Sequence, residues 1–287
     1  MARYREIKKR IQEKYNTLPK NQQRVADHLI NNLDEIPFMS IHDLSKVVEV
    51  SVASIVRFAQ GIGFTGFNEL RAEIASSLKN QLSNKEIFPL FEKHQTKEDL
   101  LTEVANVDIT NINNTLNLID RKVFDDLISS INSADRVFTA GLGISYLLSE
   151  ILAYQLTQVG IDASALKHTH TLFHEQILFL TKGDLLITFS FPPYSKETVD
   201  AARFAAERNI SVIAITNKNA SPVTFYSKAS LIVKSDNMLY TNSFAAISVL
   251  INAIATACAV KKKSRANKIL KETEEIMVAQ NQIIIGS

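Results

Sequence analysis

The sequence predicts an all-α helix-turn-helix domain joined to an α/β domain with a five-stranded parallel sheet flanked by helices. Apolar residues recur at helical spacing throughout the first 80 residues, where no strand-like run occurs. After residue 105, five short β-rich runs alternate with helical stretches, which is the pattern that βαβ units produce. A length of 287 residues is ample for two domains. We therefore divide the chain into a helical domain (1–80), a linker with an entry helix (81–104), an α/β domain (105–262) and a C-terminal helix or tail (263–287).

Two short helices joined by a tight turn form the most informative part of the helical domain. Ser40 and Ser51 are placed to cap helices that we expect over residues 41–48 and 52–60. This spacing matches the helix-turn-helix, which inserts its second helix into the major groove of DNA. The apolar stripe that should face the core consists of Val52, Ile55, Val56 and Ala59.

The outward side of the second helix would then meet DNA. The residues expected there are Ser51, Ala53, Ser54 and Arg57. Arg57 is the strongest candidate because a guanidinium fork suits guanine or a phosphate, and a surface ion pair is its alternative role. Lys46, Lys20 and Arg24 are candidates for phosphate contacts or for a merely solvated surface. Residues 1–24 carry eight Lys and Arg side chains against two Glu, and this net charge of +6 favours a polyanionic partner.

A longer segment, residues 18–75, resembles the N-terminal domain of the RpiR family of bacterial regulators. The shared features include Leu18-Pro19, Val56-Arg57-Phe58 and the run Gly63-Phe64-x-Gly66-Phe67. Val52 and Ser54 stand where the family has an acidic residue and a threonine. The resemblance implies a transcriptional regulator that binds double-stranded operator DNA, which we expect to be an inverted repeat.

The α/β part resembles the SIS domain, the sugar isomerase module that follows the helix-turn-helix in that family. Its first motif, Gly141-x-Gly143-x-Ser145, stands between a predicted strand and a predicted helix. Glycines let the backbone approach a ligand, and a helix N-terminus offers free N–H groups to an anion. The resemblance therefore implies a site for a sugar phosphate or a related anion.

The second phosphate loop of the family has the form Ser-x-Ser-Gly-x-Thr, and this chain departs from it. Ser190 matches the first serine and Ser195 the threonine, but Pro192 and Pro193 replace the second serine and the glycine. Two prolines have no N–H to donate, so part of a phosphate cradle is lost. The residues expected to compensate or to complete the site are Tyr194, Ser195, Lys196 and Glu197.

The resemblance predicts a repressor of carbohydrate-metabolism genes that senses a sugar phosphate and forms a homodimer or tetramer. An activator fits the same sequence. Two alternatives stay open: a sugar-phosphate isomerase with an accessory helical domain, and a SIS-type protein whose helical domain contacts another protein. Glu197 and His174 are the acid–base candidates, and His170 with His174 the candidate metal ligands. Because neither set has a visible partner in the sequence, we predict no catalysis, no metal and no cofactor.

Composition indicates where the protein acts. The single cysteine, Cys258, lies in an apolar run and excludes an intrachain disulfide framework, as expected in a reducing compartment. The N-terminus is charged throughout, and no uncharged apolar run reaches the roughly 20 residues of a membrane span. We therefore expect a cytoplasmic protein without a membrane partner.

Overall fold

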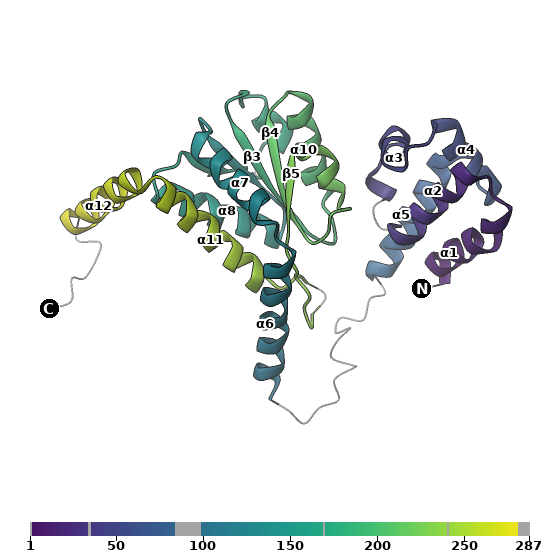
Figure 1. Cartoon of the computed structure of the whole chain (residues 1–287), viewed down its shortest axis with the longest axis horizontal. Helices are drawn as coiled ribbons and strands as arrows, with labels where there is room; N and C mark the ends of the chain where they lie inside the picture. Colours follow the sequence, from purple (N-terminus) through teal and green to yellow (C-terminus); the bar gives the residue numbers. More distant parts are fainter. Residues whose placement is uncertain (1, 34–35, 84–98, 169, 240, 281–287) are drawn as a thin grey trace. The chain divides into compact units, whose positions relative to one another are not determined.

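The computed structural model describes the chain except residues 1, 34–35, 84–98, 169, 240 and 281–287 (Figure 1). It divides into two compact units, Met1–Lys93 and His94–Ser287. The division falls inside the segment predicted as linker, and each unit is described by itself below.

The first unit is entirely helical in its described part. Its elements are α1 (Ala2–Lys14), η1 (Tyr15–Thr17), α2 (Lys20–Asn31), η2 (Ile36–Phe38), α3 (Ile41–Val48), α4 (Val52–Gly61) and α5 (Phe67–Ser83). Both predicted helix starts are confirmed. Ser40 forms a capping box with Asp43, and the hydroxyl of Ser51 accepts a hydrogen bond from the N–H of Ser54. Glu49 makes the turn between α3 and α4 in the left-handed conformation, with φ of 54°.

The inner face of α4 differs in part from the predicted apolar stripe. Ile55 and Ala59 are fully buried as expected, whereas Val52 and Val56 are only half-buried. Phe58, which lies outside the stripe, is fully buried. The reason is that α4 contacts α2, α3 and α5 together, so the core covers more of the helix than one narrow stripe.

The second unit is an α/β domain with the predicted five parallel strands in the order β2-β1-β3-β4-β5. Its elements are α6 (Leu100–Leu118), α7 (Arg121–Ser133), β1 (Val137–Ala140), α8 (Ile144–Gln158), β2 (Ala163–Ala165), α9 (Phe173–Ile177), β3 (Leu185–Ser190), α10 (Lys196–Glu207), β4 (Ser211–Thr216), η3 (Pro222–Tyr226), β5 (Ala229–Ile232), α11 (Ala245–Lys261) and α12 (Lys263–Ala279).

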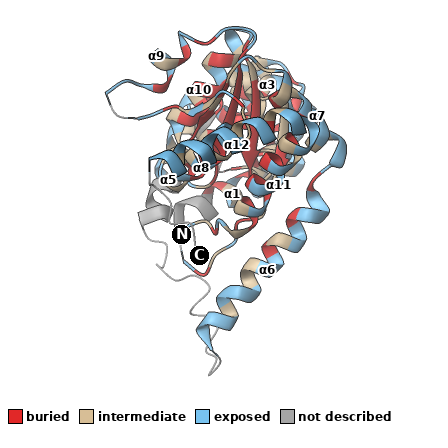
Figure 2. Cartoon of the chain, turned by 90° about the vertical axis from the view of Figure 1, so that its left-hand side faces the viewer, coloured by how far each residue is buried: buried red, intermediate tan, exposed pale blue. Residues whose placement is uncertain are grey.

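Helices cover both faces of the sheet, which is therefore buried in the interior (Figures 1 and 2). Successive residues of a strand point to opposite faces. Ile187 and Phe189 of β3 thus pack with residues of α7, α8 and α11, whereas Leu186 packs with residues of α9 and α10. Cys258 belongs to the first of these layers, and burial raises the pKa of its thiol to about 12.

No single helix in the described part of the chain is both long and apolar enough to cross a membrane. The helices α11 and α12 reach the required length and hydropathy only as a pair, and they are bent by 107°. One face of α11 is buried against the sheet.

Candidate functional site

The N-terminal turn of α4 lies at the surface of the first unit. Ser51 uses its hydroxyl to cap the helix and forms a 2.9 Å hydrogen bond with the hydroxyl of Ser54. Ala53 and Arg57 are exposed, and Ser54 is half-buried. The cap therefore fixes the start of the helix while small side chains leave room for another molecule to approach its N-terminus.

The predicted DNA-contacting cations fall into two groups. Arg57, Lys20 and Lys46 are exposed and form no ion pair or hydrogen bond with other described residues. Arg24 instead donates to the carboxylate of Glu49 at 3.0 Å and to its backbone carbonyl at 3.3 Å. Because Glu49 makes the turn between the two helices, Arg24 tethers that turn to α2. Sequence reasoning missed this role because the two residues are 25 positions apart.

The predicted effector residues gather at the ends of β1 and β3, which are neighbours in the sheet. From β1 the chain passes through α8 to β2 on one side, and from β3 it passes through α10 to β4 on the other. Open parallel sheets bind ligands at such a reversal of strand order. The structure thus brings both predicted loops to one edge, where α8 and α10 begin.

The first loop can be built only with glycine at one position. A Cβ atom on Gly141 would lie 2.6 Å from the backbone carbonyl of Ser145, closer than atoms can pack. Gly143 precedes α8 with φ of 61°, a conformation that glycine adopts without strain. Ser145 is buried in the first turn of α8, against the close approach of Gly141.

Buried hydroxyl groups without partners occur around the second loop. Ser190 ends β3 with 2% of its surface exposed, and Thr198 in the first turn of α10 has 1% exposed. Neither hydroxyl has a hydrogen-bond partner among the described residues. A buried polar group is normally hydrogen-bonded, so this edge of the sheet has unused capacity to bind a polar molecule. Thr198 was not among the predicted site residues.

The remaining residues of the second loop are held by the protein itself. Ser195 caps α10 by accepting from the N–H of Thr198 at 3.3 Å. Tyr194 is buried, and its hydroxyl donates to the side chain of Asn217, just after β4, at 2.7 Å. Pro192 and Pro193, joined by a cis peptide bond, stand where the family motif has amide donors. Anion binding here would therefore depend on the N–H groups that open α10.

The charged residues predicted for the site already have partners. Lys196 is exposed and pairs with Asp200, one turn along α10. Glu197 pairs with His168 at 2.8 Å and accepts a 3.3 Å hydrogen bond from the N–H of Phe173. Glu197 therefore anchors the segment before α9 to the start of α10. His174 instead lies edge-on to the ring of Phe204, so the two acid–base candidates do not form a pair.

The described residues contain no cluster of three His, Cys, Asp or Glu side chains that could hold a metal ion. His170 and His174 are both exposed.

Comparison with known proteins places both units in families. Residues 5–81 match the helix-turn-helix domain of the rpiR family, and residues 130–257 match the SIS domain. The chain belongs to the RpiR family. It is 29% identical to an HTH-type transcriptional regulator of Haemophilus influenzae over 238 residues, or 81% of each chain.

Two solved structures are similar to this RpiR-family chain. The NanR protein of Vibrio vulnificus, complexed with ManNAc-6P, has a TM-score of 0.65 at 23% identity over 96% of this chain and 98% of its own. The sugar isomerase domain of an RpiR transcription factor from Sphaerobacter thermophilus has a TM-score of 0.60 at 26% identity, covering 62% and 99% of the two chains. The RpiR-family protein described here is thus a transcriptional regulator with a SIS domain.

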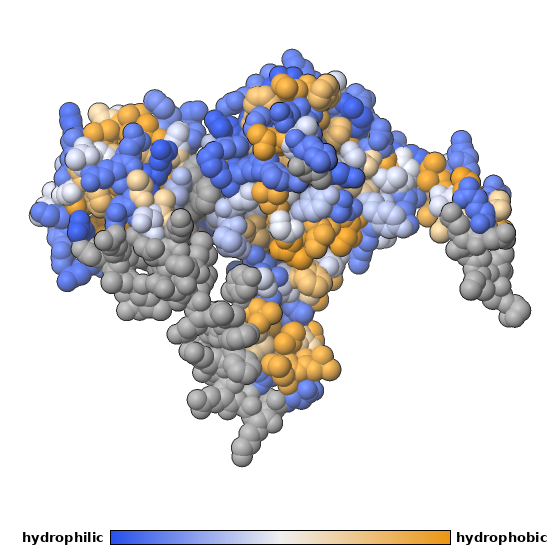
Figure 3. All heavy atoms as spheres, turned by 180° about the vertical axis from the view of Figure 1, so that it is seen from behind, coloured by the Kyte–Doolittle hydropathy of each residue, from blue (hydrophilic) through white to orange (hydrophobic). Residues whose placement is uncertain are grey.

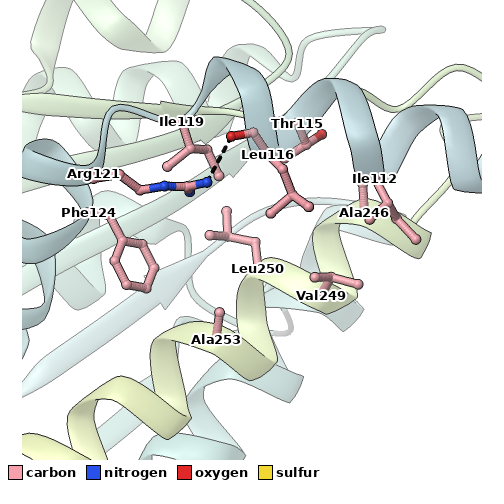
Figure 4. A pocket seen from close by; sticks show the side chains of 10 residues that line it. All are labelled: Ile112, Thr115, Leu116, Ile119, Arg121, Phe124, Ala246, Val249, Leu250 and Ala253. Atoms are coloured by element: carbon pink, nitrogen blue, oxygen red, sulfur yellow. Dashed lines mark hydrogen bonds between the residues drawn. The ribbon is translucent and has the colours of Figure 1, made fainter.

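The SIS domain of this RpiR-family protein also contains an apolar cavity (Figure 4). It has a volume of about 180 Å³ and lies between α6, α7 and α11. Its lining consists of Ile112, Thr115, Leu116, Ile119, Arg121, Phe124, Ala246, Val249, Leu250 and Ala253. Arg121 does not reach into it as a free cation, because its guanidinium donates to the carbonyl of Leu116 at 3.0 Å. The cavity includes none of the predicted effector residues and offers little to an anion.

Proposed function

We propose that this regulator represses carbohydrate-metabolism genes by binding an inverted-repeat operator, and that a sugar phosphate in the SIS domain controls that binding. DNA contact is assigned to Ser51, Ala53, Ser54, Arg57, Lys46, Lys20 and Arg24. Effector contact is assigned to Gly141, Gly143, Ser145, Ser190, Tyr194, Ser195, Lys196 and Glu197.

The observation that carries the DNA assignment is the exposed start of α4. A recognition helix reads bases with its N-terminal residues, which must be reachable by the duplex. Ala53 and Arg57 are exposed there, and Arg57 has no partner within the described residues. Lys20 and Lys46 supply further unpaired positive charge for phosphates.

The sheet edge supports the effector assignment. Two helix N-termini, a glycine that admits no Cβ, and buried hydroxyls without partners meet at the ends of β1 and β3. These groups suit the hydroxyls and the anionic oxygens of a sugar phosphate. The V. vulnificus neighbour was solved with ManNAc-6P, which makes this compound the first probe to test.

A symmetric assembly would complete this function, because a two-fold protein matches a palindromic operator. We propose a homodimer or tetramer formed through the SIS domain. Exposed apolar side chains support it, among them Leu147, Ile151 and Tyr154 at helical spacing on α8 and several on α6. Figure 3 shows apolar atoms gathered at the surface of this domain. Binding to chromosomal DNA would place the protein in the cytoplasm.

The test is a thermal-shift screen with phosphosugars, including ManNAc-6P, other hexosamine phosphates and sugar-acid phosphates. A phosphosugar that raises the melting temperature should also change the affinity of the protein for its own promoter DNA. Ser145→Phe and Ser195→Phe should each abolish that response while DNA binding persists, because Ser145 lies in the first turn of α8 and Ser195 caps α10. Ser164→Phe, at an exposed position on β2, is the control. A normal response in both loop variants would place the effector elsewhere.

A sugar-phosphate isomerase is the alternative. The pairing of Glu197 with His168 leaves an acid–base group at the edge of the site, so turnover deserves a direct assay. Conversion of an aldose phosphate by the purified protein, lost in Glu197→Gln, would favour the enzyme.

A further inference from the structure

Two consecutive residues, Asn242 and Ser243, form hydrogen bonds to the second effector loop and to α6 respectively. The side-chain amide of Asn242 donates to the backbone carbonyl of Pro192, inside the loop. The same side chain accepts a 3.0 Å hydrogen bond from the hydroxyl of Ser235. The next residue, Ser243, is buried and donates to the carboxylate of Asp108 on α6 at 2.5 Å. The segment between β5 and α11 therefore touches both the effector loop and α6.

Two more polar contacts fix α6 to this segment. Asn111 is 2% exposed, donates to the carbonyl of Asp236 at 2.7 Å and accepts from its N–H at 3.2 Å. Thr115 accepts from the N–H of Lys234 at 2.9 Å. Asp108, Asn111 and Thr115 are spaced by three and four residues, so they occupy one face of α6.

The hydrogen bonds of α6 are directional, whereas its apolar contacts are not. Apolar side chains of α6 also pack on α11, beside which it runs in Figure 1. Apolar burial is non-directional and tolerates small sliding movements. Hydrogen bonds have strict geometry, so they hold α6 in one position relative to the segment that touches the effector loop.

We propose that Asn242, Ser243 and Asp108 are positioning residues that couple the effector loop to α6. This inference rests on the proposed function, in which the loop contacts a sugar phosphate. A ligand that binds at Ser195 displaces or locks the carbonyl of Pro192, and Asn242 transmits the change to Ser243 and Asp108. The first described helix after the DNA-binding unit is α6, so its position is the output of the SIS domain. In this proposal the ligand-free and ligand-bound states differ in these hydrogen bonds, and that difference is what lets the ligand shift the equilibrium between them.

The first test needs no effector and no DNA. Amide hydrogen exchange is followed by mass spectrometry in the full-length protein, in peptides covering residues 190–198 and 100–112. Asp108→Ala should raise exchange in the distant 190–198 peptide by about tenfold, the scale of a lost hydrogen bond to a charged group. Asn242→Ala should do the same to the α6 peptide. Asp108→Asn keeps an acceptor oxygen and should restore the wild-type pattern.

A matched control comes from the same helix. Asn114 is exposed and has no side-chain partner in the described part of the chain, so Asn114→Ala should change neither distant peptide. An increase confined to α6 in Asp108→Ala would overturn the proposal. If Asp108→Ala fails to fold, Ser243→Ala removes the same hydrogen bond from the other side and decides the question.

The second test uses ManNAc-6P and the promoter DNA of the protein. In the wild type, saturating ManNAc-6P should change DNA affinity by about 5–150-fold, and Asp108→Ala should bind both partners but lose that factor. An unchanged factor in Asp108→Ala would overturn the signalling role. If no phosphosugar alters the wild-type protein, the proposed function fails, whereas the exchange experiment still decides whether the coupling exists.

Discussion

Replacing Arg57 with alanine tests the proposed DNA surface most directly. The side chain is exposed and has no partner among the described residues, so its removal should change the free energy of unfolding by no more than about 0.5 kcal/mol. If its guanidinium contacts guanine or a phosphate, operator binding should weaken by about 1–3 kcal/mol, or about 5–150-fold. The large effect on binding and the small effect on stability separate a contact residue from a structural one.

The assay is fluorescence anisotropy with promoter DNA at several salt concentrations. Arg57→Lys distinguishes the two kinds of contact, because lysine preserves a phosphate contact better than a bidentate contact to guanine. Loss of a phosphate contact should also reduce the salt slope by about 1. Lys122→Ala, which removes an exposed charge from α7, is the control. Wild-type affinity and slope in Arg57→Ala would refute the assignment of α4 as the recognition helix.

Two further predictions concern local structure. Gly141→Ala should lower the melting temperature of the SIS domain, because its Cβ would lie 2.6 Å from the Ser145 backbone and overpacking costs about 1–3 kcal/mol. Gly66→Ala, in the helical unit, meets no atom within 4 Å and has no positive φ, so it should cost less, and an equal loss of stability in the two variants would contradict the argument. Burial lowers the pKa of His28 below its ordinary value of 6.5, so the folded helical unit resists protonation that the unfolded chain accepts. The contribution of the neutral His28 to the stability of the helical unit should therefore be fully present above pH 6.5 and be lost as the pH falls below that value. In thermal melts, His28→Leu should flatten this dependence of stability on pH.

Most of the fold could be predicted because the signals are local. The caps at Ser40 and Ser51 and the five β-rich runs each depend on a few adjacent residues, and all are confirmed. The burial of Phe58 was missed because it depends on three helices that surround α4. The apolar pattern of a single helix does not show how many neighbouring helices pack against it.

The candidate sites were predictable only as loops, not as sets of contacts. Gly141 and Ser145 form one motif in the sequence, and the structure brings them into direct contact. The partners of Arg24 and Glu197 lie 25 and 29 residues away, and no local pattern identifies them. The hydrogen bond from Asn242 to Pro192 joins residues 50 positions apart, and it forms because the segment after β5 lies beside the loop that follows β3.

Arg57 and Lys196 differ in whether they form an ion pair, and this difference affects how salt should act on the two proposed sites. Arg57 is unpaired at the surface of α4, whereas Lys196 lies against Asp200 at the sheet edge. Under the proposed function, operator affinity should therefore fall as the salt concentration rises, by a slope of about 1 for each phosphate contact, while binding of a ligand through hydroxyls and helix amides should change less. If a sugar phosphate releases the protein from its operator, as proposed, a lower concentration of it would then suffice at high salt, so the response would depend on ionic strength as well as on the metabolite.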